Sequence, residues 1–352
     1  MKIAVPREIK PLEGRVALVP ECCGHLVRLG HEVYVQEGAG LSSGYPDEEY
    51  ARCGARLLSY ARAVYAAGEL VVKVKEPYQQ EPGWLREGQL LFCFLHLAAE
   101  PALTRELLDS GVTAVGFETV EESDGSLPVL APMSDIAGRL AVQIGTHLLH
   151  APQGGKGILL GGVAAAERGR VTVIGAGHVG ANAARLAAAM GAEVTVFDRN
   201  PAKLDAMRNV GNNVTALYPY SEAMGDTVAQ SDLLIGAVLV PGARAPRVVS
   251  ADRIEAMGQG SVVVDVSVDQ GGCIQTTRPT TYADPTYEVQ GVTHFCVTNM
   301  PGGVPRSASK ALCASVMPYL LRLAEPDWRE HPALARGINL ERGKLVHPAL
   351  KQ

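Results

Sequence analysis

The stretch VTVIGAGHVG, residues 171–180, decides the fold of this chain. Its first four residues predict a buried strand, and the alanine-rich run that follows predicts a helix. The three glycines between them have the spacing GxGxxG, which is informative only in such a strand–turn–helix context. We therefore predict a βαβ unit that binds the pyrophosphate of a dinucleotide.

Each glycine of this loop has a role that a Cβ atom would prevent. Gly175 permits the tight turn, Gly177 lets the pyrophosphate approach the backbone, and Gly180 lets the helix pack closely on the strand. The amides at the start of the helix, including that of Val179, hold the phosphates. His178 lies either beside the pyrophosphate or in solvent.

A second strand of this unit, Glu193–Phe197, ends at Asp198. The separation from the glycine loop is that of a carboxylate that bonds the adenosine ribose hydroxyls. A carboxylate there repels a 2′-phosphate, so we predict NAD rather than NADP as the cofactor. The alternative is that Asp198 only caps a turn.

The length of 352 residues predicts two domains, because single hydrophobic cores stop growing at roughly 250–300 residues. Short β-rich runs alternate with helical patterns on both sides of a long helical pattern, Ser134–His150, for which Ser134 is the expected N-cap. Another helical pattern, Ser307–Leu323, returns the chain to the first lobe. We predict an α/β protein with two doubly wound Rossmann-like domains and a cleft between them, linked by long helices. The expected domains are 1–133 plus 305–352 for the substrate and 134–304 for NAD.

Composition excludes several other classes of protein. The net charge of −5 offers no basic field for a nucleic acid. No apolar run reaches the roughly 18 residues of a membrane helix, and no leader is evident, so we expect a cytoplasmic protein with no membrane partner. The seven cysteines show no metal-ligand spacing. They predict reduced, mostly buried core residues and no metal site.

Charged residues that can carry chemistry lie in short segments beside strands and turns. These segments and their neighbours resemble the alanine dehydrogenase family, in motif order, from Met1 to about Asn339. The motifs are KVKEP (73–77), LHLAAEP (95–101), APMSDIAGR (131–139), GGKG (154–157), IGAGHVG (174–180), IGAVLVPGARAP (235–246), DQGG (269–272), DPTY (284–287) and NMPGGVPR (299–306). The nucleotide-binding component of proton-translocating transhydrogenase is similar in fold and in several motifs.

The resemblance implies a role for four residues at the substrate. Arg15 and Lys75 correspond to the cations that hold the substrate carboxylate and carbonyl, and His96 and Asp269 to the acid/base groups. An amino acid carboxylate needs such a fixed cation, and the imine and carbinolamine steps need a group that exchanges protons near neutral pH. Only the KVKEP pattern favours Lys75 over Lys73, since both lie on the same face of a strand.

Each assignment has a structural alternative. Arg15 can be a surface arginine in a loop, His96 a satisfied core histidine, and Asp269 the cap of the turn that follows it. Further positions at the nucleotide follow from the resemblance: Ser134, Lys203, Val238, Leu239, Val266, Val297, Asn299 and Met300.

The function implied is NAD-dependent oxidative deamination of L-alanine to pyruvate and ammonium by a homo-oligomer, a hexamer by resemblance. Two alternatives stay open. One is the NAD(H)-binding component of a proton-translocating transhydrogenase, and the other is a dehydrogenase for another small amino acid or cyclic imine.

Three positions depart from the family pattern. Val19 stands before Pro20, where relatives usually carry a threonine, so an N-cap oxygen is lost at a cost on the order of 1 kcal/mol. Cys296 replaces a smaller residue in the strand that leads to Asn299, so packing near the nicotinamide is expected to differ. Ser267 replaces an apolar residue close to Asp269 and changes the local polarity.

Overall fold

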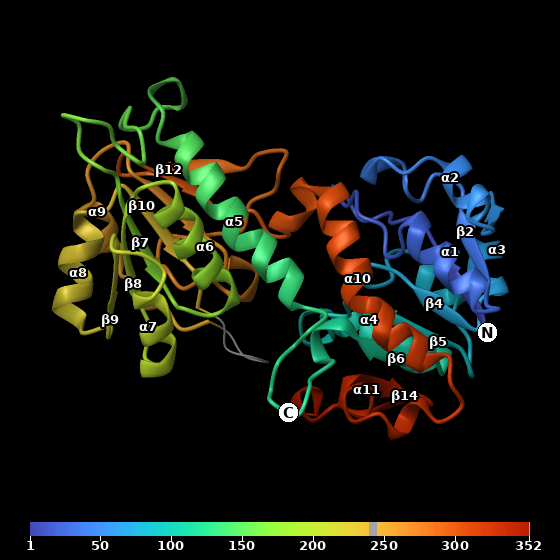
Figure 1. Cartoon of the computed structure of the whole chain (residues 1–352). Helices are drawn as coiled ribbons and strands as arrows, with labels where there is room; N and C mark the ends of the chain where they lie inside the picture. The colour runs from blue at the N-terminus through green and yellow to red at the C-terminus, as the bar shows by residue number, and fades with distance from the viewer. Residues whose placement is uncertain (239–244, 352) are drawn as a thin grey trace. The chain divides into compact units, whose positions relative to one another are not determined.

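The computed structural model describes residues 1–238 and 245–351 (Figure 1). The chain forms two compact units. The first contains residues 1–133 and 302–352, and the second contains residues 134–301. Each unit is built on one sheet with helices on its faces.

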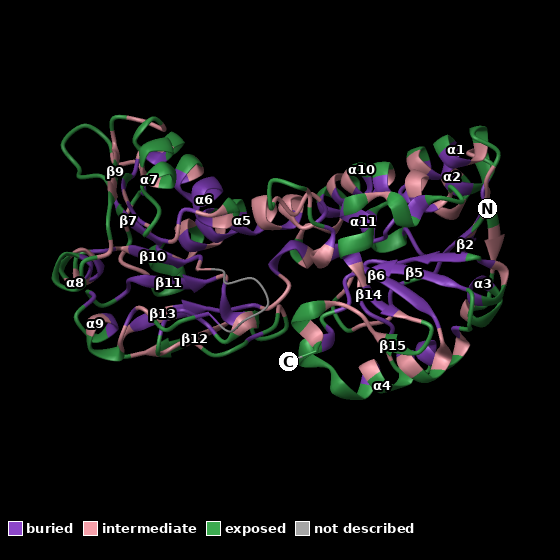
Figure 2. Ribbon diagram, turned by 90° about the horizontal axis from the view of Figure 1, so that it is seen from below, coloured by how far each residue is buried: buried purple, intermediate pink, exposed green. Residues whose placement is uncertain are grey.

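The first unit contains an eight-stranded sheet in the order β15-β14-β6-β5-β4-β1-β2-β3. Strands β1 to β6 are all parallel, whereas β14 pairs antiparallel with β6 and β15 antiparallel with β14. Their bounds are β1 (Lys2–Val5), β2 (Glu32–Gln36), β3 (Arg56–Leu58), β4 (Leu70–Val72), β5 (Leu90–Cys93), β6 (Thr113–Gly116), β14 (Ile338–Glu341) and β15 (Lys344–Leu345). The central strands β4, β5 and β6 are buried at every residue, as helices on both faces of a parallel sheet require (Figure 2).

The order of these strands reverses next to β1. The chain first adds β2 and β3 on one side of β1 and then β4, β5 and β6 on the other. The loops that leave β1 and β4 therefore diverge, and such a switch point is where open α/β sheets bind ligands, at the carboxyl ends of the strands.

Six α-helices belong to the described part of the first unit. They are α1 (Pro20–Arg28), α2 (Asp47–Arg52), α3 (Ala61–Ala67), α4 (Pro101–Ser110), α10 (Pro305–Leu323) and α11 (Pro332–Gly337). Val19 is the N-cap residue of α1 and makes no side-chain capping bond, as the valine at this position predicts.

The second unit contains a seven-stranded sheet in the order β12-β13-β11-β10-β7-β8-β9, in which only β12 is antiparallel. Its strands are β7 (Arg170–Ile174), β8 (Glu193–Phe197), β9 (Val214–Leu217), β10 (Leu233–Gly236), β11 (Val262–Asp265), β12 (Thr286–Val289) and β13 (Val292–Phe295). Its helices are α5 (Ala131–Leu148, which begins in the first unit), α6 (His178–Ala189), α7 (Pro201–Arg208), α8 (Ser221–Ala229) and α9 (Ala251–Glu255). The strand order reverses next to β7, between β7 and β10.

The start of α5 differs from the prediction. Ser134 does not cap this helix, because α5 begins three residues earlier at Ala131. Pro132 lies in the first turn, where its missing N–H would have no intrahelical partner. Ser134 is therefore part of the helix.

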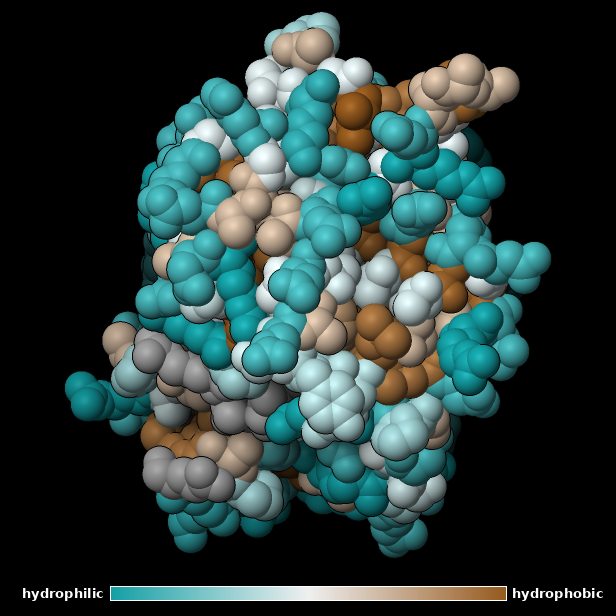
Figure 3. All heavy atoms as spheres, turned by 90° about the vertical axis from the view of Figure 1, so that its left-hand side faces the viewer, coloured by the Kyte–Doolittle hydropathy of each residue, from teal (hydrophilic) through white to brown (hydrophobic). Residues whose placement is uncertain are grey.

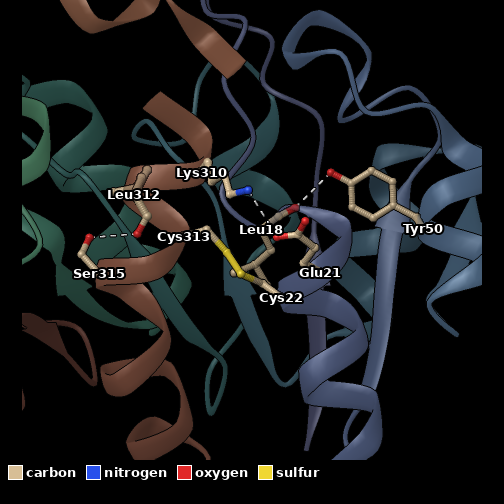
Figure 4. The surroundings of a disulfide bond; sticks show 8 residues. All are labelled: Leu18, Glu21, Cys22, Tyr50, Lys310, Leu312, Cys313 and Ser315. Atoms are coloured by element: carbon tan, nitrogen blue, oxygen red, sulfur yellow. Dashed lines mark hydrogen bonds and ion pairs between the residues drawn. A yellow bond between two sulfur atoms is a disulfide. The ribbon is translucent and has the colours of Figure 1, made fainter. Parts of the chain in front are cut away.

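The expectation of seven reduced cysteines is wrong for two of them. Cys22 of α1 and Cys313 of α10 form a disulfide with their Cα atoms 7.0 Å apart (Figure 4). The two helices pack against each other, with Lys310 and Glu21 paired at 3.7 Å nearby. The cysteines are 291 residues apart in sequence, so no local spacing could indicate the pair.

The described residues lack the features of a membrane span and of a metal site. One face of the molecule carries mostly hydrophilic side chains with smaller apolar areas among them (Figure 3). Within residues 1–238 and 245–351, no helix has the length and apolar character needed to cross a bilayer. In the same residues no three His, Cys, Asp or Glu side chains gather as a group that could hold a metal ion.

Candidate functional site

The predicted substrate residues of the first unit follow three of its parallel strands. Arg15 lies in the loop after β1, Lys75 after β4 and His96 after β5. Because the carboxyl ends of parallel strands meet at one edge of the sheet, these side chains lie at the switch point. Burial, and next the positive charge of Arg15, lowers the pKa of Lys75, so the two cations are close.

Arg15 is held by a carboxylate two residues earlier. Its Nε donates to Oε1 of Glu13 at 2.7 Å and its Nη2 to Oε2 at 2.5 Å, while Nη1 approaches Sδ of Met133 at 3.2 Å. Both side chains of the pair are almost fully buried. Burial opposes ionisation of Glu13, but the hydrogen bonds and the charge of Arg15 lower its pKa. The guanidinium is thus fixed in one orientation.

The two lysines of the KVKEP segment have different surroundings. Lys73 is buried between two carboxylates, with Nζ at 3.1 Å from Oε2 of Glu8 and 3.1 Å from Oε2 of Glu81. Burial opposes its charge, but these carboxylates raise the pKa of Lys73 above its ordinary value. Since Lys73 is engaged in this way, its contacts favour Lys75 as the substrate residue.

His96 has an unusual main-chain conformation. Its φ of 49° lies in the left-handed region, at the N-cap of a 3-10 helix, η3 (Leu97–Ala99). Oε1 of Glu118 accepts a hydrogen bond from its amide at 2.7 Å and one from the amide of Leu95 at 3.1 Å. The imidazole is 41% exposed and stacks on the ring of Phe94.

Glu76 connects two of these loops. Its Oε2 lies 3.1 Å from Nδ1 of His96, and its Oε1 is paired with Nζ of Lys10, in the loop after β1. Burial opposes ionisation, yet the hydrogen bonds of His96 and Lys10 and the charge of His96 hold the pKa of Glu76 well below its usual range.

Three residues that contact the predicted site residues were not predicted from the sequence: Glu13, Glu76 and Glu118. Glu76 stands inside the KVKEP motif and Glu13 two residues before Arg15, so proximity to predicted site residues was an available signal. No such signal indicated Glu118, because it contacts His96 from the end of the neighbouring strand β6 and is distant in sequence.

A cavity of about 360 Å³ adjoins Arg15 within the first unit. Its lining includes Arg7, Glu8, Glu13, Gly14, Arg15 and Ser42. This volume is at the lower end of those of small-molecule sites.

The glycine loop of the second unit has the predicted geometry. A Cβ on Gly175 would lie 2.5 Å from the carbonyl oxygen of Ala237, and one on Gly180 would lie 1.7 Å from that of Gly175. A Cβ on Gly177 would meet nothing within 4 Å. The loop therefore requires glycine at two positions for its own packing and leaves open space at the third, as a site for a pyrophosphate needs.

Asp198, which follows β8, is hydrogen-bonded to the glycine loop. Its Oδ2 accepts the amide of Ala176 at 2.7 Å and its Oδ1 that of Asn200 at 2.8 Å. The capping role is therefore present, and it fixes the carboxylate beside the glycine loop. Contact with a ribose stays a prediction.

The other predicted nucleotide residues are spread over several loops. His178 faces solvent, with a side chain 64% exposed and Nδ1 at 3.7 Å from Oδ1 of Asp135. Lys203, on α7, is exposed. Leu239 lies outside the described residues, but Val238, after β10, is half-buried.

The loops after β11 and β13 carry the remaining predicted residues, and Val266 is half-buried at the end of β11. Asp269 is exposed on a 3-10 helix, η6 (Val268–Gln270). Asn299 has a φ of 70°, and the flanking Val297 and Met300 are buried.

Two departures from the family pattern have defined surroundings. Ser267 is buried, and its amide donates to Oδ1 of Asp265 at 3.0 Å. This carboxylate also accepts from Cys273 and Thr277, and burial raises its pKa. Cys296 is buried with Sγ 3.6 Å from the hydroxyl of Tyr287, so it packs on β12.

Comparison with family models covers almost the whole chain. Residues 4–137 match the model "Alanine dehydrogenase/PNT, N-terminal domain", and residues 141–348 match "Alanine dehydrogenase/PNT, C-terminal domain".

Individual relatives are similar over their full length. The chain is 48% identical to an alanine dehydrogenase of Halomonas elongata, covering 100% of this chain and 96% of the relative. It is 47% identical to an alanine dehydrogenase of Mycobacterium tuberculosis, covering 98% and 95%.

Two solved structures share the fold. One, titled L-alanine dehydrogenase, has a TM-score of 0.96 at 47% identity and covers 100% of this chain and 98% of its own. The other, a transhydrogenase from Sinorhizobium meliloti, has a TM-score of 0.86 at 27% identity and covers 99% and 100%.

Proposed function

Because the chain belongs to the alanine dehydrogenase/PNT family, we propose that it is an alanine dehydrogenase that uses Arg15, Lys75 and His96 of its first unit to act on the amino acid. The reaction is oxidative deamination of L-alanine to pyruvate and ammonium, and it is reversible. The observation that carries the proposal is the grouping of a buried guanidinium, a half-buried ammonium and an imidazole at the switch point of the first sheet. A protein that only bound NAD(H) would not need this grouping.

Arg15 and Lys75 bind the substrate through its oxygens. Glu13 fixes the Arg15 guanidinium, whose planar shape matches a carboxylate. Lys75, next to it, approaches the carbonyl oxygen that forms as alanine becomes pyruvate. A pair of cations in a buried setting discriminates against molecules that lack this anionic group.

His96 and Asp269 exchange protons during turnover. Bound NAD would supply a hydride acceptor, and loss of a hydride from Cα would leave the substrate as an iminium. Water then adds to the iminium carbon, and the resulting carbinolamine releases ammonium. Each of these steps moves a proton, and an imidazole can do this near neutral pH.

The second unit supplies residues that suit NAD. The open space at Gly177 suits the pyrophosphate and the fixed carboxylate of Asp198 suits the ribose hydroxyls, so we propose NAD as the cofactor. By family resemblance we also propose a homohexamer.

The activity is tested by the rise of NADH absorbance with NAD and a panel of L-amino acids. We expect turnover with alanine, and little with larger side chains. His96→Ala and Asp269→Ala should each lower kcat by roughly 10²-fold or more, while NADH still binds. Normal turnover by either variant would remove that residue from the mechanism. Hydride exchange between NADH and an NADP analogue, without amino-acid turnover, would instead favour the alternative function, that of a transhydrogenase component.

A further inference from the structure

The main chain of His96 is held in a conformation that it would not adopt alone. Residues other than glycine at positive φ cost roughly 1–3 kcal/mol and persist only where their surroundings fix them. Here the carboxylate of Glu118 accepts the amides of both Leu95 and His96. The direction in which the imidazole leaves the backbone is therefore set by a residue of η4 (Phe117–Thr119), the 3-10 helix that follows β6.

The side chain of His96 is then fixed through one nitrogen. Nδ1 lies 3.1 Å from Oε2 of Glu76, and Glu76 is only 3% exposed. Lys10 pairs with the other oxygen of Glu76, and although burial opposes ionisation, the hydrogen bonds that Glu76 accepts hold its pKa well below its usual range, so this side chain is a carboxylate. A carboxylate only accepts hydrogen bonds, so Nδ1 must be the donor.

Glu76 is itself restrained. Lys10 pairs with its other oxygen, from the loop after β1. The residue that follows is Pro77, which restricts the backbone of Glu76 to extended conformations. The carboxylate thus cannot turn easily toward another partner.

We propose that Glu76 is a positioning residue that keeps neutral His96 protonated on Nδ1, so that Nε2 is the nitrogen that exchanges protons with the substrate. The inference rests on the role proposed above for His96. A neutral imidazole carries one N–H, so a proton on Nδ1 leaves Nε2 as an acceptor. When Nε2 takes a proton, the resulting imidazolium faces the Glu76 carboxylate, which stabilises it at no cost of rearrangement.

The test uses Glu76→Gln in the full-length enzyme, with Glu106→Gln as the matched control. Glu106 is exposed on α4 and makes the same change of charge. A glutamine can either donate or accept, so it no longer selects one tautomer. We expect kcat to fall by roughly 10²-fold in Glu76→Gln. We expect little change in KM for alanine or NAD, and no effect in Glu106→Gln.

The ¹⁵N shifts of histidine rings, assigned by comparison with His96→Gln, report the tautomer directly. In the native enzyme at a pH where its imidazoles are neutral, we expect a protonated Nδ1 and a bare Nε2 for His96, and in Glu76→Gln a shift toward the other tautomer. A native His96 protonated on Nε2 would overturn the proposal without any variant, and so would a Glu76→Gln enzyme with unchanged tautomer and kcat. Full activity of His96→Ala would refute the catalytic role of His96 but leave the tautomer measurement valid.

Discussion

At the scale of single residues, two lysines of one short segment meet opposite electrostatic surroundings. Lys73 lies between two buried acids, Glu8 and Glu81, whereas Lys75 lies near another cation, Arg15. The first arrangement stabilises the fold, because burial of a carboxylate without a partner is costly. The placement of Lys75 near Arg15 lowers the stability of the fold, because like charges repel. It also supplies positive charge where a substrate carboxylate would bind.

Substitution of these lysines should separate stability from activity. At pH 8, where Glu8 has released its proton, Lys73→Met leaves buried negative charge without its cation and should lower the free energy of unfolding by about 3–5 kcal/mol. Lys75→Met removes a cation that Arg15 opposes and should change stability by less than about 1 kcal/mol, yet strongly lower kcat/KM for alanine. Urea unfolding and NADH absorbance measure the two effects. Equal losses of stability in both variants would contradict this division.

The sequence and its family resemblance predicted Arg15, Lys75 and His96 as site residues, and the structure places them after three parallel strands of one sheet. Glu118 could not be predicted from the sequence, since its contact with His96 depends on β5 and β6 being neighbours in the sheet. The left-handed backbone conformation of His96 could not be predicted either, because a histidine does not require that conformation. Such contacts between loops follow from the sheet order and not from spacing along the chain.

At the scale of secondary-structure elements, the β7–α6 junction shows three glycines with different reasons to be glycine. Gly180 brings α6 against the carbonyl of Gly175, with no room for a Cβ. Gly177 has φ near −73° and open space around its Cα, so the fold itself accepts a side chain there. Only a ligand would need that space.

Alanine at these two positions should therefore have contrasting effects. Gly180→Ala forces its Cβ into a backbone oxygen and should lower the free energy of unfolding by roughly 1–3 kcal/mol or more. Gly177→Ala should unfold at the same temperature as the native protein but bind NADH more weakly, because its Cβ would enter the open space in which we propose that the pyrophosphate lies. Circular dichroism melting and NADH fluorescence titration test the pair. If Gly177→Ala binds NADH normally, the pyrophosphate does not lie at this glycine.

Most strands could be predicted from apolar runs, and β8 has the predicted bounds, Glu193–Phe197. The first residue of α5, Ala131, could not be predicted, because Ser134 is by residue type the preferred N-cap in this segment, yet the helix begins three residues before it. The antiparallel strand β14 was also missed. It becomes a strand only because β6 leaves an edge for it to pair with.

At the scale of the whole molecule, both units use the same rule to place chemistry. In each, the strand order reverses beside the first strand, and the loops that carry the predicted residues leave the sheet near that reversal. Charged groups collect at this edge in the first unit, and several are buried there. The stability of the molecule must therefore depend on pH through them.

Glu8 gives this dependence an unusual sign. Burial, together with the charges of Glu13 and Glu81, raises its pKa to about 7 from an ordinary value of 4.5, although Lys73 opposes the shift. Between these two pH values the folded protein keeps a proton that the unfolded chain releases. The free energy of unfolding contributed by Glu8 therefore falls as the pH rises from about 4.5 to about 7. Glu13 and Glu76, whose pKa values are lowered, act in the opposite sense, and their contribution is lost as the pH falls below the ordinary value of 4.5.

Glu8→Gln should isolate the first of these effects. Glutamine resembles the protonated acid and does not titrate, so the stability of the native protein relative to this variant should decrease from pH 5 to pH 8. Urea unfolding at unit intervals of pH measures that difference, and Glu106→Gln, exposed on α4, should show no such slope. A difference that stays constant, or that grows in favour of the native protein as the pH rises, would mean that Glu8 is already ionised in the folded protein at pH 5. Lys73 would then outweigh burial in setting the charge of the network beneath the substrate residues.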